Sequence, residues 1–288
     1  MSRWATGWLV AIALLAPFAA VAQEEEASGD PWTIRALEEV NGGLKAQWMD
    51  IRVEQLELLS KDKEKLKAGA RLHRQLSRWV PRDPRRAADG DRLTYLIDRR
   101  GGSAGEEIHA DVEAALDRAI GSWATEHCLE EVGIVKRPST GEDVSIFDFS
   151  LGYGGFGNWQ AADVVLAGWM PPSFFDAVAA EGGTSILALS VTFIFVDSDG
   201  EPTDIDGNGY YDIAASEIYF NDGFSWHTAS GFDVETVALH EIGHSLGIGH
   251  IDAKKKEATM SPVYAGIHPE LESRDRAAAC SIWASWPY

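Results

Sequence analysis

Three histidines lie close together in the segment ALHEIGHSLGIGH, which spans residues 238–250. His240 and His244 are four residues apart, so on a helix both imidazoles project from the same face. Such a pair can bind one tetrahedral zinc ion at about 2.0–2.1 Å per nitrogen. Gly247 tolerates the positive φ of a sharp reversal, which lets His250 return as a third ligand. Three neutral protein ligands leave a fourth position open for water, as in catalytic rather than structural zinc sites.

Glu241 directly follows the first of these histidines. There its carboxylate would face the water on the metal, whose pKa zinc lowers to about 7, and accept a proton as the water attacks a carbonyl. The same carboxyl can then pass the proton to the leaving amine. The alternative is a histidine-rich helix whose imidazoles only fill the core. The catalytic interpretation is favoured because three of the chain's eight histidines fall within eleven residues, with Glu241 and Gly247 also in place.

The elements around this segment follow from hydrophobic periodicity. A helix from about residue 234 to 246, capped by Asp233 or Ser230, would carry the first two histidines. Apolar residues at helical spacing predict an amphipathic helix over 106–126. Apolar runs predict core strands at 93–98, 163–167, 186–196 and 217–221. One strand, a helix, further strands and then two helices is an α+β order.

The first 22 residues have the layout of a cleaved secretory signal peptide. Arg3 supplies positive charge, residues 8–18 form an apolar run, and residues 20–22 offer a small-residue cleavage site. The run falls short of the roughly 20 apolar residues that span a bilayer. We therefore expect a protein secreted to the periplasm or the extracellular space, with cleavage after Ala22 and no stable membrane association.

Residues 23–80 are predicted to form a small N-terminal module that carries no chemistry of its own. After an acidic stretch, Asp30 followed by proline predicts the start of a helix that runs to about residue 44. Residues 50–59 predict a strand with imperfect alternation.

A segment rich in proline and charge, residues 79–91, is predicted to link this module to the main domain at 81–288. Two alternatives stay open for the front module. It is either an inhibitory prosegment removed near residues 82–86 or a permanent accessory domain.

The histidine segment resembles the metzincin metallopeptidases, whose pattern is H-E-x-x-H-x-x-G-x-x-H followed by a methionine turn. Downstream, the stretch TMSPVY holds Met260, Pro262 and Tyr264 and is similar to the matrixin form of that turn. The closing LESRDRAAACSIWASW also resembles the last matrixin helix. The resemblance implies a zincin-type α+β catalytic domain over roughly 81–288, with a twisted mixed sheet, an active-site helix and a C-terminal helix. It also implies a zinc-dependent endopeptidase acting on protein or peptide substrates, with Met260 beneath the metal and Pro262 and Tyr264 lining the substrate pocket.

This sequence departs from the matrixin pattern in two places. No cysteine precedes Cys128, so latency by a thiol on the zinc is not expected. Tyr219 stands where matrixins have a histidine for a second, structural zinc, so a single catalytic zinc is predicted.

Cys128 and Cys280 are the only cysteines, and an even pair in an exported chain predicts a disulfide. The alternative is two buried thiols. The resemblance places Cys128 just after the first long helix and Cys280 in the last one.

An acidic loop, DIDGNGYYD at 204–212, alternates oxygen-bearing side chains around Gly209. Ala215 occupies the position where an EF-hand needs a bidentate glutamate, which excludes that motif. The loop is either a solvated turn or a calcium site whose ligands would be Asp204, Asp206, Asn208 and Asp212.

The chain carries 25 basic and 45 acidic residues, a formal charge of −20, which disfavours nucleic acid as a partner. Two other functions stay open beside the endopeptidase. One is a secreted binding or scaffold protein with a structural zinc, and the other is a zinc hydrolase of a non-peptide amide or ester. The sequence gives no indication of the oligomeric state.

Overall fold

The structure is a computed structural model that describes residues 32–40, 43–57, 77–86, 90–98, 110–139, 141, 144–154, 157–197, 199–251 and 258–286. Of residues 32–57 only the backbone is described. The predicted signal peptide and the acidic stretch that follows it lie outside the described residues. No helix among the described residues is long and apolar enough to cross a membrane.

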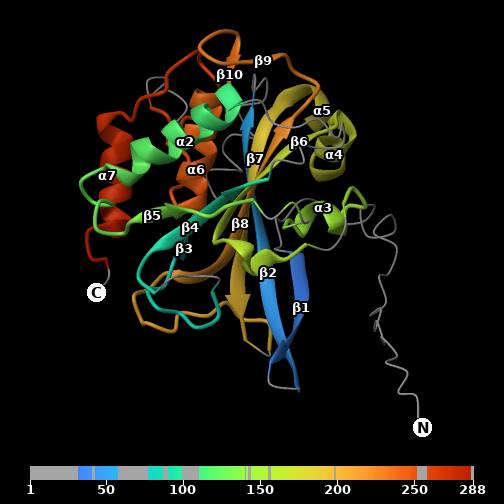
Figure 1. The fold of residues 1–288 in the computed structure, drawn as a ribbon, viewed down its shortest axis with the longest axis vertical. Coiled ribbons are helices and arrows are strands. Elements are labelled where there is room, and N and C mark those ends of the chain that lie inside the picture. Colours follow the sequence, from blue (N-terminus) through green and yellow to red (C-terminus); the bar gives the residue numbers. More distant parts are fainter. Residues whose placement is uncertain are drawn as a thin grey trace. The chain divides into compact units, whose positions relative to one another are not determined.

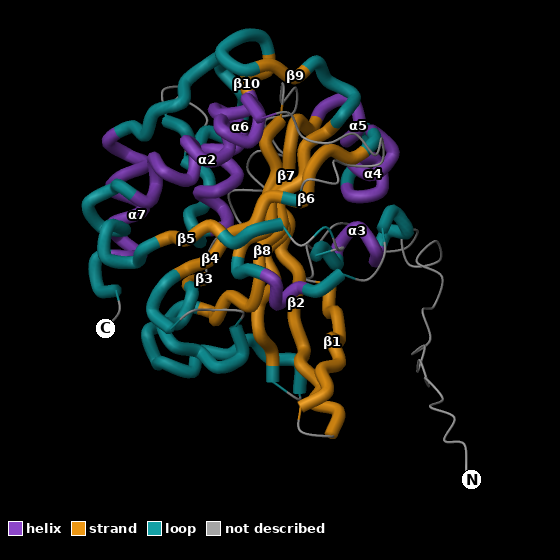
Figure 2. The backbone as a smooth tube through the Cα atoms, viewed as in Figure 1, coloured by secondary structure: helices purple, strands orange, loops and turns teal. Residues whose placement is uncertain are grey.

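A mixed sheet lies at the centre of the fold, with strand order β1-β2-β7-β8-β6-β4-β5 and the short β3 paired to β8 (Figures 1 and 2). Strands β5, β4, β6 and β8 are parallel neighbours, whereas β7 is antiparallel to β8. The strands that follow the front segment are β3 (Ser77–Arg78), β4 (Leu93–Ile97), β5 (Ile134–Lys136), β6 (Val164–Met170), β7 (Ile186–Val196) and β8 (Tyr211–Asn221). The four predicted core strands are confirmed, although β8 begins six residues before the predicted start.

Apolar side chains cover both faces of the sheet, because successive residues of a strand point to opposite sides. In β4, Tyr95 and Ile97 join one buried cluster while Leu96 joins the other. The first cluster includes buried side chains of the three long helices, which are α2 (Ala110–Ala124), α6 (Val234–Ser245) and α7 (Ser273–Trp283). The short elements are α3 (Phe147–Ser150), η2 (Trp159–Ala161), α4 (Pro172–Val178), α5 (Gly182–Ser185), β9 (Trp226–His227) and β10 (Phe232–Asp233). The α+β architecture is therefore confirmed.

The helix predicted from Asp30 to about residue 44 is wrong. Residues Trp32–Val40 form strand β1, which pairs antiparallel with β2 (Gly43–Glu57). The pairing of Val40 with Gly43 leaves two residues, Asn-Gly, between the strands, which is the strongest short hairpin signal in a sequence. β2 also pairs antiparallel with β7, so the front segment extends the main sheet. The strand predicted at 50–59 lies within and just beyond the end of β2.

The segment predicted as a linker, residues 79–91, is anchored to the domain instead. The Trp79 side chain is fully buried, and its indole nitrogen donates a 2.9 Å hydrogen bond to the carbonyl of Ser245. The Arg86 guanidinium lies 3.1 Å from Asp163, and both side chains are shielded from solvent. Part of the charge in this segment therefore belongs to a buried ion pair, since burying a charge requires a partner.

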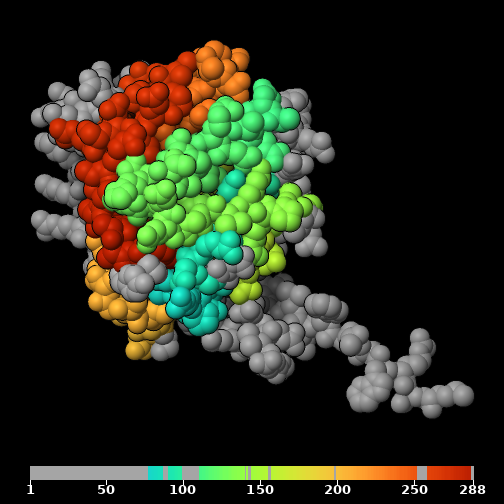
Figure 3. Space-filling model, turned by 60° about the vertical axis from the view of Figure 1, so that its left-hand side comes forward, coloured from blue at the N-terminus to red at the C-terminus, as the bar shows by residue number. Residues whose placement is uncertain are grey.

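Cys128 and Cys280 form the predicted disulfide, with their Cα atoms 5.1 Å apart. The bond joins the loop after α2 to α7, across a sequence separation of 152 residues. An ion pair between Arg276 and Glu126 bridges the same two regions. Figure 3 shows α2 in green beside the red C-terminal residues on the molecular surface. These links fix the last helix against the layer that contains α6.

Candidate active site

The three histidines predicted as metal ligands converge at one point. The Nε2 atoms of His240, His244 and His250 lie 3.0, 3.1 and 3.2 Å from one another. In a tetrahedral zinc site with Zn–N distances of 2.0–2.1 Å, the ligand nitrogens lie about 3.3 Å apart. The spacing therefore suits three ligands of one tetrahedral zinc ion.

Hydrogen bonds fix the protonation of two of these rings. The Nδ1 atom of His240 lies 2.7 Å from the carbonyl oxygen of Thr259, and Nδ1 of His244 lies 2.8 Å from that of Ile248. A carbonyl oxygen can only accept, so each Nδ1 carries the proton and each Nε2 presents a lone pair. Burial lowers the pKa of His240 to about 4, which keeps that ring neutral. Lone pairs directed at one point suit a cation, so the site fits the metal that its residue types predict.

Capping and a glycine reversal set the position of these side chains. Asp233 caps α6 as predicted, because its carboxylate accepts a 2.8 Å bond from the backbone N–H of Thr236. At the other end Gly247 has a φ of 82°. A Cβ there would overlap the carbonyl oxygen of Ser77, so only glycine fits both the angle and the space. The chain then turns back and brings His250 to the other two histidines.

Two indoles satisfy backbone carbonyls at the C-terminal end of α6, where the helix itself offers no donors. The indole N–H of Trp79 donates a hydrogen bond to the carbonyl of Ser245. The indole N–H of Trp283 donates a 3.0 Å hydrogen bond to the carbonyl of Leu246. Neither tryptophan is among the site residues that the sequence predicts. Their contacts join segments far apart in the chain, which local pattern does not reveal.

Met260 lies directly against the histidine helix. It is fully buried, and a Cβ on Gly243 would overlap its sulfur atom. Gly243 lies between the two helical histidines in the sequence, so Met260 packs against this part of α6. Glu241, on the same helix, is also fully buried.

A sequence profile described as Matrixin matches residues 87–284. The chain belongs to the matrixin family. Matrixins use zinc and are metalloendopeptidases, and the match covers the whole histidine site.

Individual relatives share shorter stretches with this matrixin. Karilysin of Tannerella forsythia is 32% identical over 132 residues, which are 46% of this chain and 24% of karilysin. Matrix metalloproteinase-19 of Mus musculus is 41% identical over 54 residues, or 18% of this chain and 10% of that protein. The hatching enzyme of Paracentrotus lividus is 37% identical over 73 residues, or 24% and 12% of the two chains. The matched parts are thus about a quarter or less of these relatives.

The residues predicted to line the substrate pocket of the matrixin domain lie beside the start of α6. The hydroxyl of Tyr264 donates a 2.9 Å hydrogen bond to the carbonyl of Gly231 and accepts a 3.2 Å hydrogen bond from the N–H of Asp233. Its ring lies 5.7 Å from that of Phe232, measured between centroids. Pro262 is buried. These contacts hold the segment after Met260 against the helix cap.

Tyr219 and Glu217 form a buried pair where the resemblance placed a metal-binding histidine. The Tyr219 hydroxyl donates a 2.6 Å hydrogen bond to Glu217, which also accepts from the backbone N–H groups of Ile146 and Phe147. Burial raises the pKa of Glu217 to about 8, although these hydrogen bonds oppose the rise. The same carboxyl and phenol therefore hold the start of α3 against β8.

The acidic loop brings three of its four predicted calcium ligands together. Asp204, Asp206 and Asp212 each place a carboxylate oxygen within 4.8 Å of the others. The Asn208 side-chain amide donates a 2.9 Å hydrogen bond to the carboxylate of Asp206. Asp212 already has a cationic partner, since Arg85 lies 2.8 Å away. Arg78 likewise lies 3.4 Å from Asp206, so two of the three clustered carboxylates have an arginine partner.

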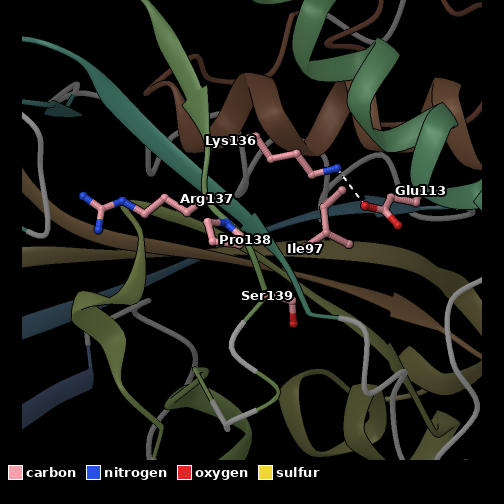
Figure 4. A pocket seen from close by; sticks show the side chains of 6 residues that line it. All are labelled: Ile97, Glu113, Lys136, Arg137, Pro138 and Ser139. Atoms are coloured by element: carbon pink, nitrogen blue, oxygen red, sulfur yellow. Dashed lines mark hydrogen bonds and ion pairs between the residues drawn. The ribbon is translucent and has the colours of Figure 1, made fainter.

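A separate pocket of about 210 Å³ lies away from the histidines, among side chains from β4, α2, β5 and the loop after β5. In Figure 4 Lys136 points toward Glu113, 2.8 Å from its carboxylate. Lys136 also lies 2.7 Å from Asp117. The Lys136 ammonium group thus pairs with two carboxylates, and we assign no chemistry to this pocket. Its lining residues are Ile97, Glu113, Lys136, Arg137, Pro138 and Ser139.

Asp275 is a further site residue that the sequence analysis missed. It is fully buried, and its carboxylate accepts from the backbone N–H of Thr259 at 2.9 Å and of Met260 at 3.0 Å. Thr259 in turn holds His240 through its carbonyl. In sequence Asp275 is one more acidic residue in the first turn of a helix. A capping-box pattern with Glu272 was the available signal.

We expect Asp275→Ala to weaken zinc binding by roughly 10- to 100-fold, the usual effect of losing an outer-shell partner. The reason is that Thr259 and Met260 lose their acceptor and release His240. Competition with a chromogenic zinc chelator measures the affinity. Asp275→Asn, which keeps one acceptor oxygen, should lie between the two forms. Wild-type affinity in Asp275→Ala would show that the carboxylate does not position the ligand.

Proposed function

We propose that this matrixin is an exported zinc endopeptidase that hydrolyses peptide bonds in protein or peptide substrates. The observation that supports this most strongly is the convergence of three Nε2 atoms within 3.2 Å on one buried helix and its return loop. His240, His244 and His250 would hold a single zinc ion. The matrixin match at 87–284 agrees with a catalytic domain at 81–288.

In this proposal the zinc ion held by His240, His244 and His250 would act as a Lewis acid, polarising the scissile carbonyl and lowering the pKa of a water molecule to about 7. Glu241 accepts the proton of the attacking water and transfers it to the leaving amine. Met260 supports the two helical histidines from below. Pro262 and Tyr264 form the wall beside the substrate residue that follows the scissile bond.

The test is Glu241→Ala, with zinc content and peptide cleavage measured on the same preparations. The variant should bind about one zinc, as one such site requires. It should lose activity on casein and on a quenched peptide library by roughly 10²- to 10⁴-fold, since a positioned general base contributes about that much. Glu235→Ala on the same helix is the matched control, because that carboxylate pairs with the exposed Arg118. It should cleave at the wild-type rate.

The other outcomes separate the alternatives. Zinc binding without peptide cleavage in wild type, together with hydrolysis of an ester or small amide, would favour the non-peptide hydrolase. Zinc without any hydrolysis would favour a structural site in a binding or scaffold protein.

Export is the second part of the proposal. The disulfide between Cys128 and Cys280 suits an oxidising compartment outside the cytoplasm. Expressed in a host with a secretory pathway, the mature protein should be found outside the cytoplasm and begin at Gln23. Mass spectrometry of the intact chain gives the first residue, and an unprocessed chain retained in the cytoplasm would contradict export.

Calcium binding by the acidic loop is the third part. A ligand that binds only the folded state stabilises that state. Calcium should therefore raise the melting temperature of the protein when the zinc concentration is held constant. Asp204→Asn should abolish that rise, since it removes the charge of a clustered carboxylate that forms no ion pair with an arginine among the described residues. Asp199→Asn, an exposed acid outside the cluster, is the control. An unchanged melting temperature in wild type across the calcium titration would leave the loop as a solvated turn.

A further inference from the structure

Strand β8 holds a separate segment of the chain through two buried side chains. The backbone N–H groups of Ile146 and Phe147 donate hydrogen bonds of 2.8 and 3.0 Å to the carboxyl of Glu217. The N–H of Asp148 donates a 3.3 Å hydrogen bond to the hydroxyl of Tyr219. That hydroxyl in turn donates a 2.6 Å hydrogen bond to Glu217. Three successive N–H groups thus end on one carboxyl–phenol pair, and we call this arrangement the β8 clasp.

The residues of the β8 clasp do not suit the second zinc ion that the matrixin resemblance associates with this position. Tyr219 stands opposite Leu189 of β7, which is apolar and fully buried. Burial and the neighbouring Glu217 carboxyl raise the pKa of the Tyr219 phenol well above its usual value, so the phenol keeps its proton. A zinc ligand has to be deprotonated. Within the part of the chain that the structure describes, groups of three possible ligands occur only at the three histidines and in the acidic loop.

The Glu217 carboxyl is enclosed in the middle of the sheet. Its register neighbours on β6 and β7 are Val165 and Val191, which are both buried in the same apolar cluster. The titratable groups that act on it are the Tyr219 phenol and the buried Asp148 carboxyl, and neither can supply a positive charge. Ionised Glu217 would therefore be a buried charge beside a second acid, which is unfavourable even with three hydrogen-bond donors.

These surroundings decide when Glu217 carries a proton. Burial raises the pKa of Glu217 from its ordinary value of 4.5 to about 8, and the Asp148 carboxyl adds to the rise that the hydrogen bonds oppose. A carboxyl whose pKa is raised by folding stabilises the fold while it is neutral. That contribution is complete below the unfolded-state value and is lost as the pH rises through about 8.

We propose that the β8 clasp takes the place of a structural metal in this matrixin and depends on a proton: it holds residues 146–148 against β8 while Glu217 is neutral and loosens when Glu217 ionises. A structural metal would make this attachment sensitive to chelators, whereas the clasp makes it sensitive to pH. The inference concerns the fold and does not rest on the proposed endopeptidase function.

The test compares the pH dependence of unfolding in wild type and in Glu217→Gln, because the amide cannot ionise. Every form is the full chain in a Glu241→Ala background, which prevents self-cleavage, and zinc is held constant. In urea titrations the unfolding equilibrium constant of the chain with Glu217 should rise roughly tenfold between pH 7 and pH 9, the change expected from one proton with a native-state pKa of about 8. Glu217→Gln should lack this rise. Glu201→Gln, at an exposed acid on the loop after β7, is the matched control and should keep it.

Hydrogen exchange supplies a local measurement on the same proteins. After correction for the intrinsic exchange rate, protection of the amides of residues 146–148 should fall roughly tenfold between pH 7 and pH 9 when Glu217 is present. In Glu217→Gln the protection should not change with pH, even if it is lower throughout. A hydrogen bond with a purely structural role would give the same pH dependence in both forms.

Tyr219→Phe provides a second variant that does not alter the carboxyl. It removes a donor that favours the ionised form, so the pKa of Glu217 should rise further. The loss of stability should therefore level off at a higher pH than in the chain with Tyr219. If Glu217→Gln does not fold, this shift carries the test.

Three results would overturn the inference. Parallel pH curves for Glu217→Gln and for the chain with Glu217 would show that this carboxyl does not bind the proton. A curve that levels off at the same pH in Tyr219→Phe would show that the phenol does not act on it. A second zinc per chain by elemental analysis, lost in Glu217→Gln or Tyr219→Phe, would show that a metal is held at the clasp after all.

Discussion

Three imidazole nitrogens that present lone pairs to one point repel one another unless a cation lies between them. In this protein the three nitrogens lie within 3.2 Å of each other, a spacing that suits a cation between them. The carbonyls of Thr259 and Ile248 fix the tautomer and direction of two of the rings. Much of the surrounding fold serves to position these three rings.

That support comes from distant parts of the chain. Asp275 holds Thr259 and Met260, and it lies on α7, which the disulfide ties to the loop after α2. Trp79 and Trp283 donate to carbonyls at the end of α6. A buried donor or acceptor left unpaired costs about 1–3 kcal/mol, so each of these contacts is also a constraint on where the helix can end. The ligand geometry is thus a property of the whole domain rather than of the histidine segment.

The sequence predicted the parts of this site whose spacing is local. The helical pair of histidines, the Asp233 cap and the Gly247 reversal each depend on neighbours within a few residues, and the structure has them as expected. Trp79 and Trp283 act across long separations, and nothing in their immediate sequence marks that role. The capping-box pattern of Asp275 indicates the start of a helix but not its contacts with Thr259 and Met260. The predicted linker failed for the same reason, since the partner of Arg86 is Asp163, in a segment far along the chain.

The front segment shows how a neighbouring edge decides secondary structure. Residues 32–40 contain good helix formers, and a proline precedes them, which favours a helix when the segment is considered alone. A hairpin of two strands is only marginally stable by itself. Pairing with β7 supplies a third strand and satisfies an edge that would otherwise stay open.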